Sequence, residues 1–118
     1  METREAVLLL QYSEKMKSGL IIGINLLDLL GSLKAEELSG GKKVLTWYLE
    51  GLLRETRVAE NVLGTAQFHD LEQKVMELVG RIQMSQFQEA QRSFSEAISL
   101  ATTSCQASMS VLVEKGLV

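Results

Sequence analysis

The only histidine of the chain, His69, lies among acidic residues, and this group is where the sequence most suggests metal or general-acid chemistry. Asp70, Glu72 and Glu77 follow it. Since His69 and Asp70 are adjacent, their side chains diverge by about 100° on a helix and would not share a ligand. A di-iron helical bundle needs Glu-x-x-His pairs, and Ala66 stands three residues before His69. We therefore expect no metal and no cofactor, and we interpret the acidic residues as favouring a helix N-terminus.

The glycine-rich segment Leu38-Ser39-Gly40-Gly41-Lys42 is a second candidate. Over four residues it resembles the signature sequence of ABC-type ATPases, in which a Ser-Gly-Gly turn at a helix start binds a γ-phosphate. Free backbone N–H groups and the helix dipole favour an anion at such a place. The expected site is a weak anion-binding site formed by Gly40, Gly41, Lys42 and Lys43. The sequence lacks the G-x-x-x-x-G-K-[ST] loop that such an ATPase would need.

Composition excludes several function classes. Lys and Arg number 12 and Asp and Glu number 15, so the net charge is −3, whereas nucleic-acid binders carry a basic surplus. One cysteine cannot form an intramolecular disulfide, and one histidine cannot build a site of several histidines. The most apolar window, Leu20–Leu33, is shorter than the roughly 20 residues that cross a bilayer. The acidic start of the chain differs from a basic secretory signal, so we expect a cytoplasmic protein without membrane or nucleic-acid partners.

The absence of proline and of period-two alternation predicts one all-α domain over residues 1–118. Helix start and stop signals divide it into four helices, expected as an antiparallel up-down-up-down bundle. The first has Thr3 as its N-cap, the third is capped by Thr65, and Ser85 with Gln88 forms a capping box for the fourth. Periodicity barely changes at Ser85, so one kinked helix is the alternative for the last two. The expected ranges are Thr3–Leu30, Ser39–Leu63, Thr65–Met84 and Ser85–Lys115.

Regular apolar stripes support this division. In the third helix, apolar residues recur at steps of three and four, as on one face of an amphipathic helix. The second helix has a wider stripe, with Val44, Trp47 and Val58 spreading around it. The third-helix stripe consists of Phe68, Leu71, Val75, Leu78 and Ile82.

The first helix has more apolar surface than a solitary bundle needs. Around Leu20–Leu33 apolar side chains point in every direction, and Gly19 and Gly23 form a flat groove for close helix contact. Residues 97–113 of the fourth helix carry no charge. We therefore expect the first and fourth helices to pack together and to meet a second copy in a homodimer, unless the 33–38 turn covers this surface. The expected self-association face is Gly19, Ile21, Gly23, Ile24, Leu27, Ala101, Cys105 and Ser108.

These patterns favour a non-catalytic, self-associating helical bundle that acts as an adaptor or regulatory module. Surplus apolar surface commonly meets another polypeptide, so an additional, unidentified protein partner is part of this expectation. The sequence lacks the convergent polar groups that an active site requires. The alternative is a helical-bundle nucleotide or phosphate binder, or a hydrolase, with its site at the dimer interface.

Overall fold

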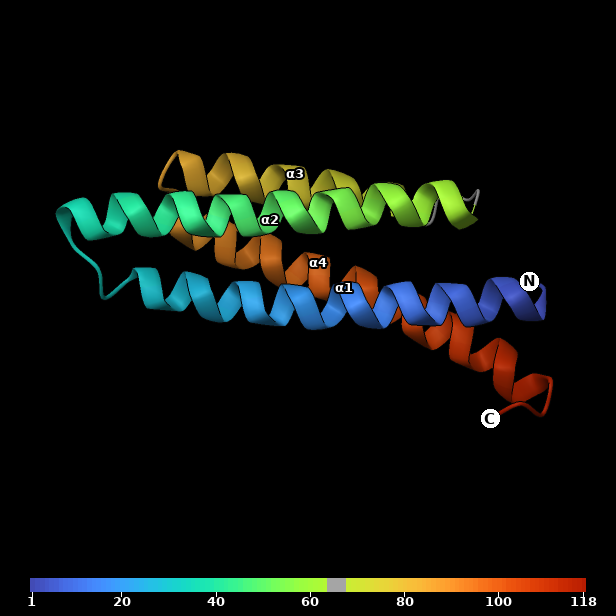
Figure 1. The fold of residues 1–118 in the computed structure, drawn as a ribbon. Coiled ribbons are helices and arrows are strands. Elements are labelled where there is room, and N and C mark those ends of the chain that lie inside the picture. The colour runs from blue at the N-terminus through green and yellow to red at the C-terminus, as the bar shows by residue number, and fades with distance from the viewer. Residues whose placement is uncertain (64–67) are drawn as a thin grey trace.

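The computed structural model describes residues 1–63 and 68–118 and consists of four α-helices (Figure 1). No strand occurs in this described part of the chain, so the all-α prediction and the four helices are confirmed. The molecule is elongated, with extents of 54 × 23 × 17 Å. No helix in the described ranges is long and apolar enough to cross a membrane. The helices are α1 (Thr3–Leu30), α2 (Ala35–Leu63), α3 (His69–Gln83) and α4 (Phe87–Glu114).

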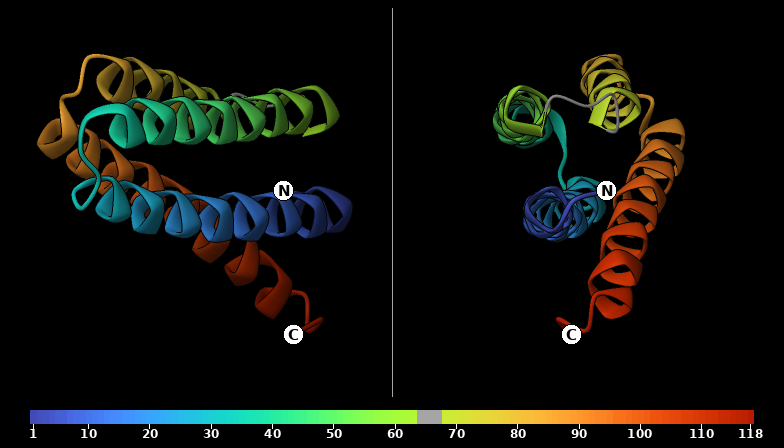
Figure 2. Two further views of the ribbon diagram at one scale, coloured as in Figure 1. Left: turned by 60° about the vertical axis from the view of Figure 1, so that its left-hand side comes forward. Right: turned by 90° about the vertical axis from the view of Figure 1, so that its right-hand side faces the viewer.

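The helices α1 and α2 lie side by side, α3 lies against α2, and α4 crosses α1 obliquely (Figures 1 and 2). The most extensive helix contact is between α1 and α4, which confirms that the first and fourth helices pack together. The C-terminal part of α4 projects beyond α2 and α3 (Figure 2).

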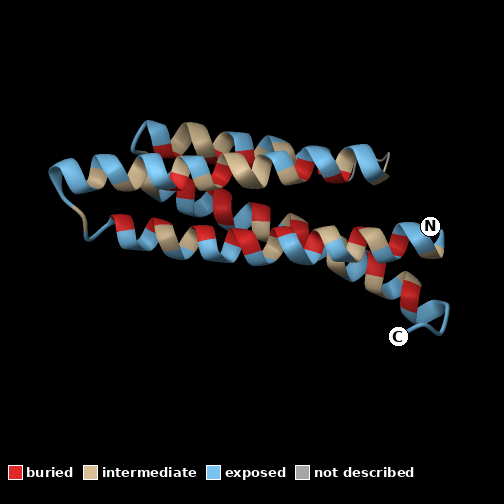
Figure 3. Ribbon diagram, in the orientation of Figure 1, coloured by how far each residue is buried: buried red, intermediate tan, exposed pale blue. Residues whose placement is uncertain are grey.

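Buried side chains lie on the inward faces of all four helices (Figure 3). Every member of the predicted third-helix stripe is buried, because steps of three and four keep it facing the other helices. Leu20 of α1, Leu49 of α2 and Phe94 of α4 are fully buried in the same core. Hydrophobic burial along these stripes therefore holds the four helices together.

The two glycines of α1 let its neighbours approach closely within the same chain. A Cβ atom added at Gly23 would lie 2.7 Å from Cε1 of Phe94, and one added at Gly19 would lie 2.7 Å from Cδ2 of Leu52. The hydroxyl of Tyr48 donates a hydrogen bond of 2.8 Å to the carbonyl oxygen of Gly19. The groove predicted for a second copy is thus filled by α2 and α4.

The helix bounds in the structure match the predicted bounds at some ends and differ from them at others. The first helix spans Thr3–Leu30 as predicted, but Glu2 rather than Thr3 is its N-cap, and the Glu2 side chain accepts no capping hydrogen bond. The second helix begins at Ala35, four residues before the predicted Ser39, so the 33–38 turn is largely part of α2. The predicted cap Thr65 lies outside the described residues.

The helices α3 and α4 are separate, and Ser85 lies at the break between them. Its φ of 59° is in the left-handed region, and the N–H groups of Ser85 and Gln86 bond to the carbonyls of Ile82 and Arg81. This hydrogen-bond pattern is a Schellman C-cap with serine in the position that favours glycine. The predicted Ser85–Gln88 capping box was wrong, since Gln86 is the N-cap of α4 and no side chain caps the helix. Gly116, directly after the predicted end of the fourth helix at Lys115, has the same geometry, with φ of 71°.

Candidate functional site

The solvent-facing side of α2 carries an exposed stripe that is apolar except for Arg54. The opposite side of this helix is buried through Leu45, Leu49 and Ala59. Trp47, the only tryptophan, leaves 74% of its surface exposed. We call this stripe the α2 outer face, and its members recur at steps of three and four: Val44, Trp47, Gly51, Arg54, Val58 and Val62.

Two depressions flank Trp47. One of about 560 Å³ lies on the side of Gln83 in α3, and the other, of about 510 Å³, lies on the side of Lys15 in α1. Trp47 therefore stands as a ridge between two hollows. The first is lined by Ser39, Lys42, Lys43, Val44, Thr46, Trp47, Glu50 and Gln83. The second is lined by Lys15, Val44, Trp47, Tyr48, Gly51, Leu52, Arg54 and Glu55.

At two glycines of α2, packing against the described residues leaves room for a larger side chain. A Cβ atom added at Gly40 would meet nothing within 4 Å, and one added at Gly51 would meet only Nη2 of Arg54 at 3.9 Å. Glycine inside a helix costs about 1 kcal/mol relative to alanine. Gly51 lies one helical turn beyond Trp47, so it leaves a flat place beside the exposed indole.

Charges of both signs lie near Trp47 along α2. Lys42 and Lys43 precede it, and Glu50, Arg54 and Glu55 follow it. Nζ of Lys42 donates to Ser85 Oγ at 2.7 Å and to the carbonyl oxygen of Gln83 at 3.2 Å, which ties α2 to the break after α3. Lys43 makes no ion pair within residues 1–63 and 68–118 and is exposed.

The predicted anion-binding site depended on a loop at Gly40 and Gly41, and the structure has a helix at these residues. Gly40 and Gly41 lie in the second turn of α2, where backbone N–H groups donate to the preceding turn of the helix. A Cβ atom at Gly41 would lie 2.6 Å from Cδ2 of Leu30, so this glycine permits the contact with α1. Lys42 is held by Ser85 and Gln83, and of the four predicted residues Lys43 alone has an uncommitted charged group.

The residues predicted for self-association are mostly inside their own chain. Gly19, Gly23, Leu27, Ala101 and Ser108 are buried, and Ile24 and Cys105 are half-buried. Burial raises the pKa of the Cys105 thiol, which makes it less nucleophilic. Only Ile21 is exposed, at 42%. Most members of the predicted face therefore make contacts within their own chain.

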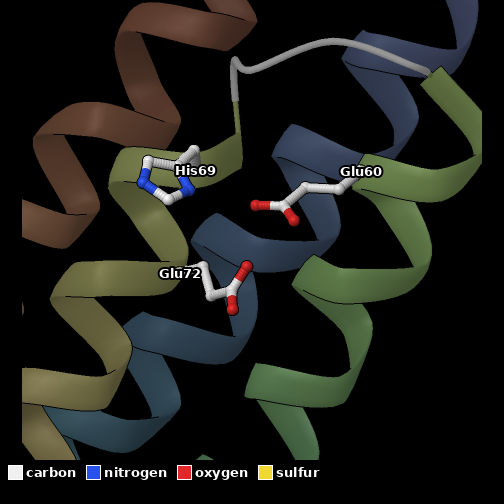
Figure 4. A group of neighbouring side chains, drawn as sticks. All are labelled: Glu60, His69 and Glu72. Carbon is white, nitrogen blue, oxygen red and sulfur yellow. The ribbon is translucent and has the colours of Figure 1, made fainter.

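Three titratable side chains meet where α2 ends and α3 begins (Figure 4). Glu60 lies in the last turn of α2, and His69 and Glu72 lie in the first turn of α3 on one helix face. One ligating atom from each lies within 4.8 Å of the others. Sequence proximity groups His69 with Asp70, Glu72 and Glu77 and misses Glu60, because Glu60 belongs to another helix.

Glu60 is the member of this group that has a buried carboxylate oxygen. Its Oε1 atom is buried and has no hydrogen-bond partner among the residues that the structure describes. Burial raises the pKa of Glu60, and the neighbouring carboxyl of Glu72 raises it further, although His69 and Arg57 act in the opposite direction. Nε of Arg57 donates to Oε1 of Glu72 at 3.3 Å. The group therefore places two carboxylates close together, and His69 and Arg57 compensate only part of their negative charge.

Glu77, the remaining acidic candidate of the sequence, belongs to a structural contact between α3 and α4. Ser93 Oγ donates a hydrogen bond to it, and Lys74 Nζ lies 3.3 Å from Glu77 and 3.4 Å from Glu96. The hydrogen bond from Ser93 and the charge of Lys74 lower the pKa of Glu77 despite its partial burial. This contact helps to hold α3 against α4.

No family model, curated protein or solved structure matches this chain. The functional assignment therefore depends on the geometry of the α2 outer face and of the Glu60–His69–Glu72 group.

Proposed function

We propose that this chain is a non-catalytic helical module, an antiparallel up-down-up-down bundle, that pairs with a second copy through the α2 outer face. The observation that carries the proposal is Trp47, which is 74% exposed between two hollows. Tryptophan is enriched among the residues that dominate binding energy at protein interfaces. A role as an adaptor or regulatory module in the cytoplasm follows as the wider proposal.

A second copy is the occupant because the α2 outer face complements itself. In a two-fold arrangement each residue faces a counterpart on the same patch, so one stripe serves both copies. If two α2 helices run in opposite directions with Trp47 over Gly51 of the second copy, Lys43 lies opposite Glu55. The open glycine then receives the indole, and Lys43 lies near a carboxylate that already pairs with Lys15 of its own copy at 3.0 Å.

The energetics favour a weak, concentration-dependent dimer. Burial of the exposed part of one Trp47 removes on the order of 150 Å² of apolar surface, which is worth about 4 kcal/mol. Two copies contribute this twice, and association costs an estimated 4–15 kcal/mol in lost freedom and ordering. The neighbouring valines, Val44 and Val58, supply additional apolar area.

Sedimentation velocity over a wide concentration range tests the proposal. The wild-type chain is expected to approach about 26 kDa, twice its 13.1 kDa, as concentration rises. Trp47→Ala is expected to remain monomeric, with unchanged helix content by circular dichroism, because the exposed indole contributes little to the fold. Leu29→Ala is the matched control, since Leu29 is 62% exposed on α1 and is not part of the α2 outer face.

Two results would overturn the proposal. One is a wild-type chain that stays at 13.1 kDa at every concentration, and the other is a Trp47→Ala variant that dimerises as tightly as wild type. The nucleotide-binding alternative makes a different prediction. A melting temperature that rises with magnesium and a nucleotide, and no longer does so in Lys43→Ala, would support that alternative instead.

A further inference from the structure

The Glu60–His69–Glu72 group has the donor set of a metal site. One imidazole nitrogen and two carboxylate oxygens lie within 4.8 Å of one another, and they come from two helices on either side of one connection (Figure 4). A tetrahedral ion with bonds of about 2.1 Å holds its ligand atoms about 3.4 Å apart. The side chains thus need to close by little more than 1 Å, which rotation of the exposed His69 and the half-buried Glu72 can supply.

The buried oxygen of Glu60 favours a cation site over a solvated acidic surface. Within residues 1–63 and 68–118 its Oε1 atom has no hydrogen-bond donor, and the nearby carboxylate of Glu72 adds negative charge instead of compensating it. Arg57 reaches only Glu72 among the members of the group. A carboxylate has two oxygen atoms, so Glu72 can accept from Arg57 and still bind an ion.

From this geometry we propose that Glu60, His69 and Glu72 bind one divalent transition-metal ion of the zinc type. A mixed imidazole and carboxylate set suits Zn²⁺, Co²⁺ or Ni²⁺, whereas Mg²⁺ and Ca²⁺ prefer sites made of oxygen alone. Three protein ligands leave a fourth position for water. The ion ties the last turn of α2 to the first turn of α3. This proposal departs from the expectation of no metal that the sequence alone supported.

Calorimetric titration of the tag-free chain with Zn²⁺ tests this site, and the visible absorption of bound Co²⁺ reports its coordination. We expect one ion per chain. His69→Ala and Glu60→Gln should each weaken binding at least tenfold. Asp70→Asn is the matched control, because Asp70 is an exposed carboxylate beside His69 that is not part of the group. Cys105→Ser should also bind like wild type, which excludes the thiol as the ligand.

The melting temperature distinguishes a variant that no longer binds Zn²⁺ from a variant that no longer folds. Without metal, Glu60→Gln should melt no lower than wild type, because the amide removes the repulsion with Glu72. With Zn²⁺ the wild type should melt several degrees higher, and Glu60→Gln should not respond. Absence of saturable Zn²⁺ binding by wild type would overturn the site, as would equal binding by wild type, His69→Ala and Glu60→Gln. Trp47→Ala should bind Zn²⁺ normally. Failure of the metal-site proposal can therefore be told apart from failure of the dimer proposal.

Discussion

The same substitution at two glycines should change stability in opposite directions. Gly23→Ala and Gly51→Ala each gain about 1 kcal/mol of helix propensity. At Gly23 the new methyl group would lie 2.7 Å from Cε1 and 3.1 Å from Cζ of Phe94. Phe94 has no exposed surface, so its ring cannot retreat into solvent. Overpacking of this kind costs about 1–3 kcal/mol, so Gly23→Ala should be less stable than wild type by up to about 2 kcal/mol.

At Gly51 the methyl group meets only Nη2 of Arg54 at 3.9 Å, and the flexible guanidinium moves away at little cost. Gly51→Ala should therefore raise the free energy of unfolding by about 1 kcal/mol. Urea unfolding followed by circular dichroism, at a concentration at which the protein is monomeric, measures both values. A Gly23→Ala variant as stable as Gly51→Ala would show that α1 and α4 do not pack at this spacing, and would refute the intrachain assignment of the glycine groove.

Two further predictions concern the contacts that join α3 to α4. Ser85→Gly should raise the free energy of unfolding by about 0.5 kcal/mol in urea, since relief of the left-handed strain outweighs the exposed hydrogen bond from Lys42; a less stable variant would contradict this. Because the pKa of Glu77 is lowered in the folded chain, its stabilisation is present above the unfolded value near 4.5 and is lost as the pH falls through the lower folded pKa. Thermal melts should show Ser93→Ala less stable than wild type at neutral pH, with the difference narrowing in acid; a constant difference would contradict the pKa shift.

Periodicity predicted the core of this fold because the third-helix stripe has a single interpretation. Leu71, Val75 and Leu78 recur at helical spacing with charges on other faces, and each is buried. The start of α2 was harder to predict. Ser39-Gly40-Gly41 has the residue types of a helix start, but Ala35 begins the helix four residues earlier and packing of Gly41 against Leu30 stabilises it there.

Local sequence also could not identify the neighbour of a helix face. Gly19 and Gly23 have the spacing of a close helix contact, but spacing does not distinguish a helix of the same chain from one of a second copy. Trp47 was counted with the wide apolar stripe of its helix, although it points away from the core. Only the packing of α2 against α1 and α3 shows which side of the helix remains exposed.

The Glu60–His69–Glu72 group depends on tertiary structure in the same way. Its two α3 members are three residues apart and therefore share a helix face. Glu60 comes from the end of α2, and no sequence spacing relates it to His69. Asp70 is adjacent to His69 in the sequence, but the side chains of adjacent residues diverge on a helix.

The emission of Trp47 tests the central claim most directly, because it is the only tryptophan and forms the ridge of the α2 outer face. Fluorescence spectra should be recorded as the chain is concentrated, in parallel with its sedimentation. We predict that the emission shifts to shorter wavelength as the dimer forms, since the exposed indole leaves water. An unchanged emission maximum while the mass doubles would show that the copies meet elsewhere and would contradict the proposed interface.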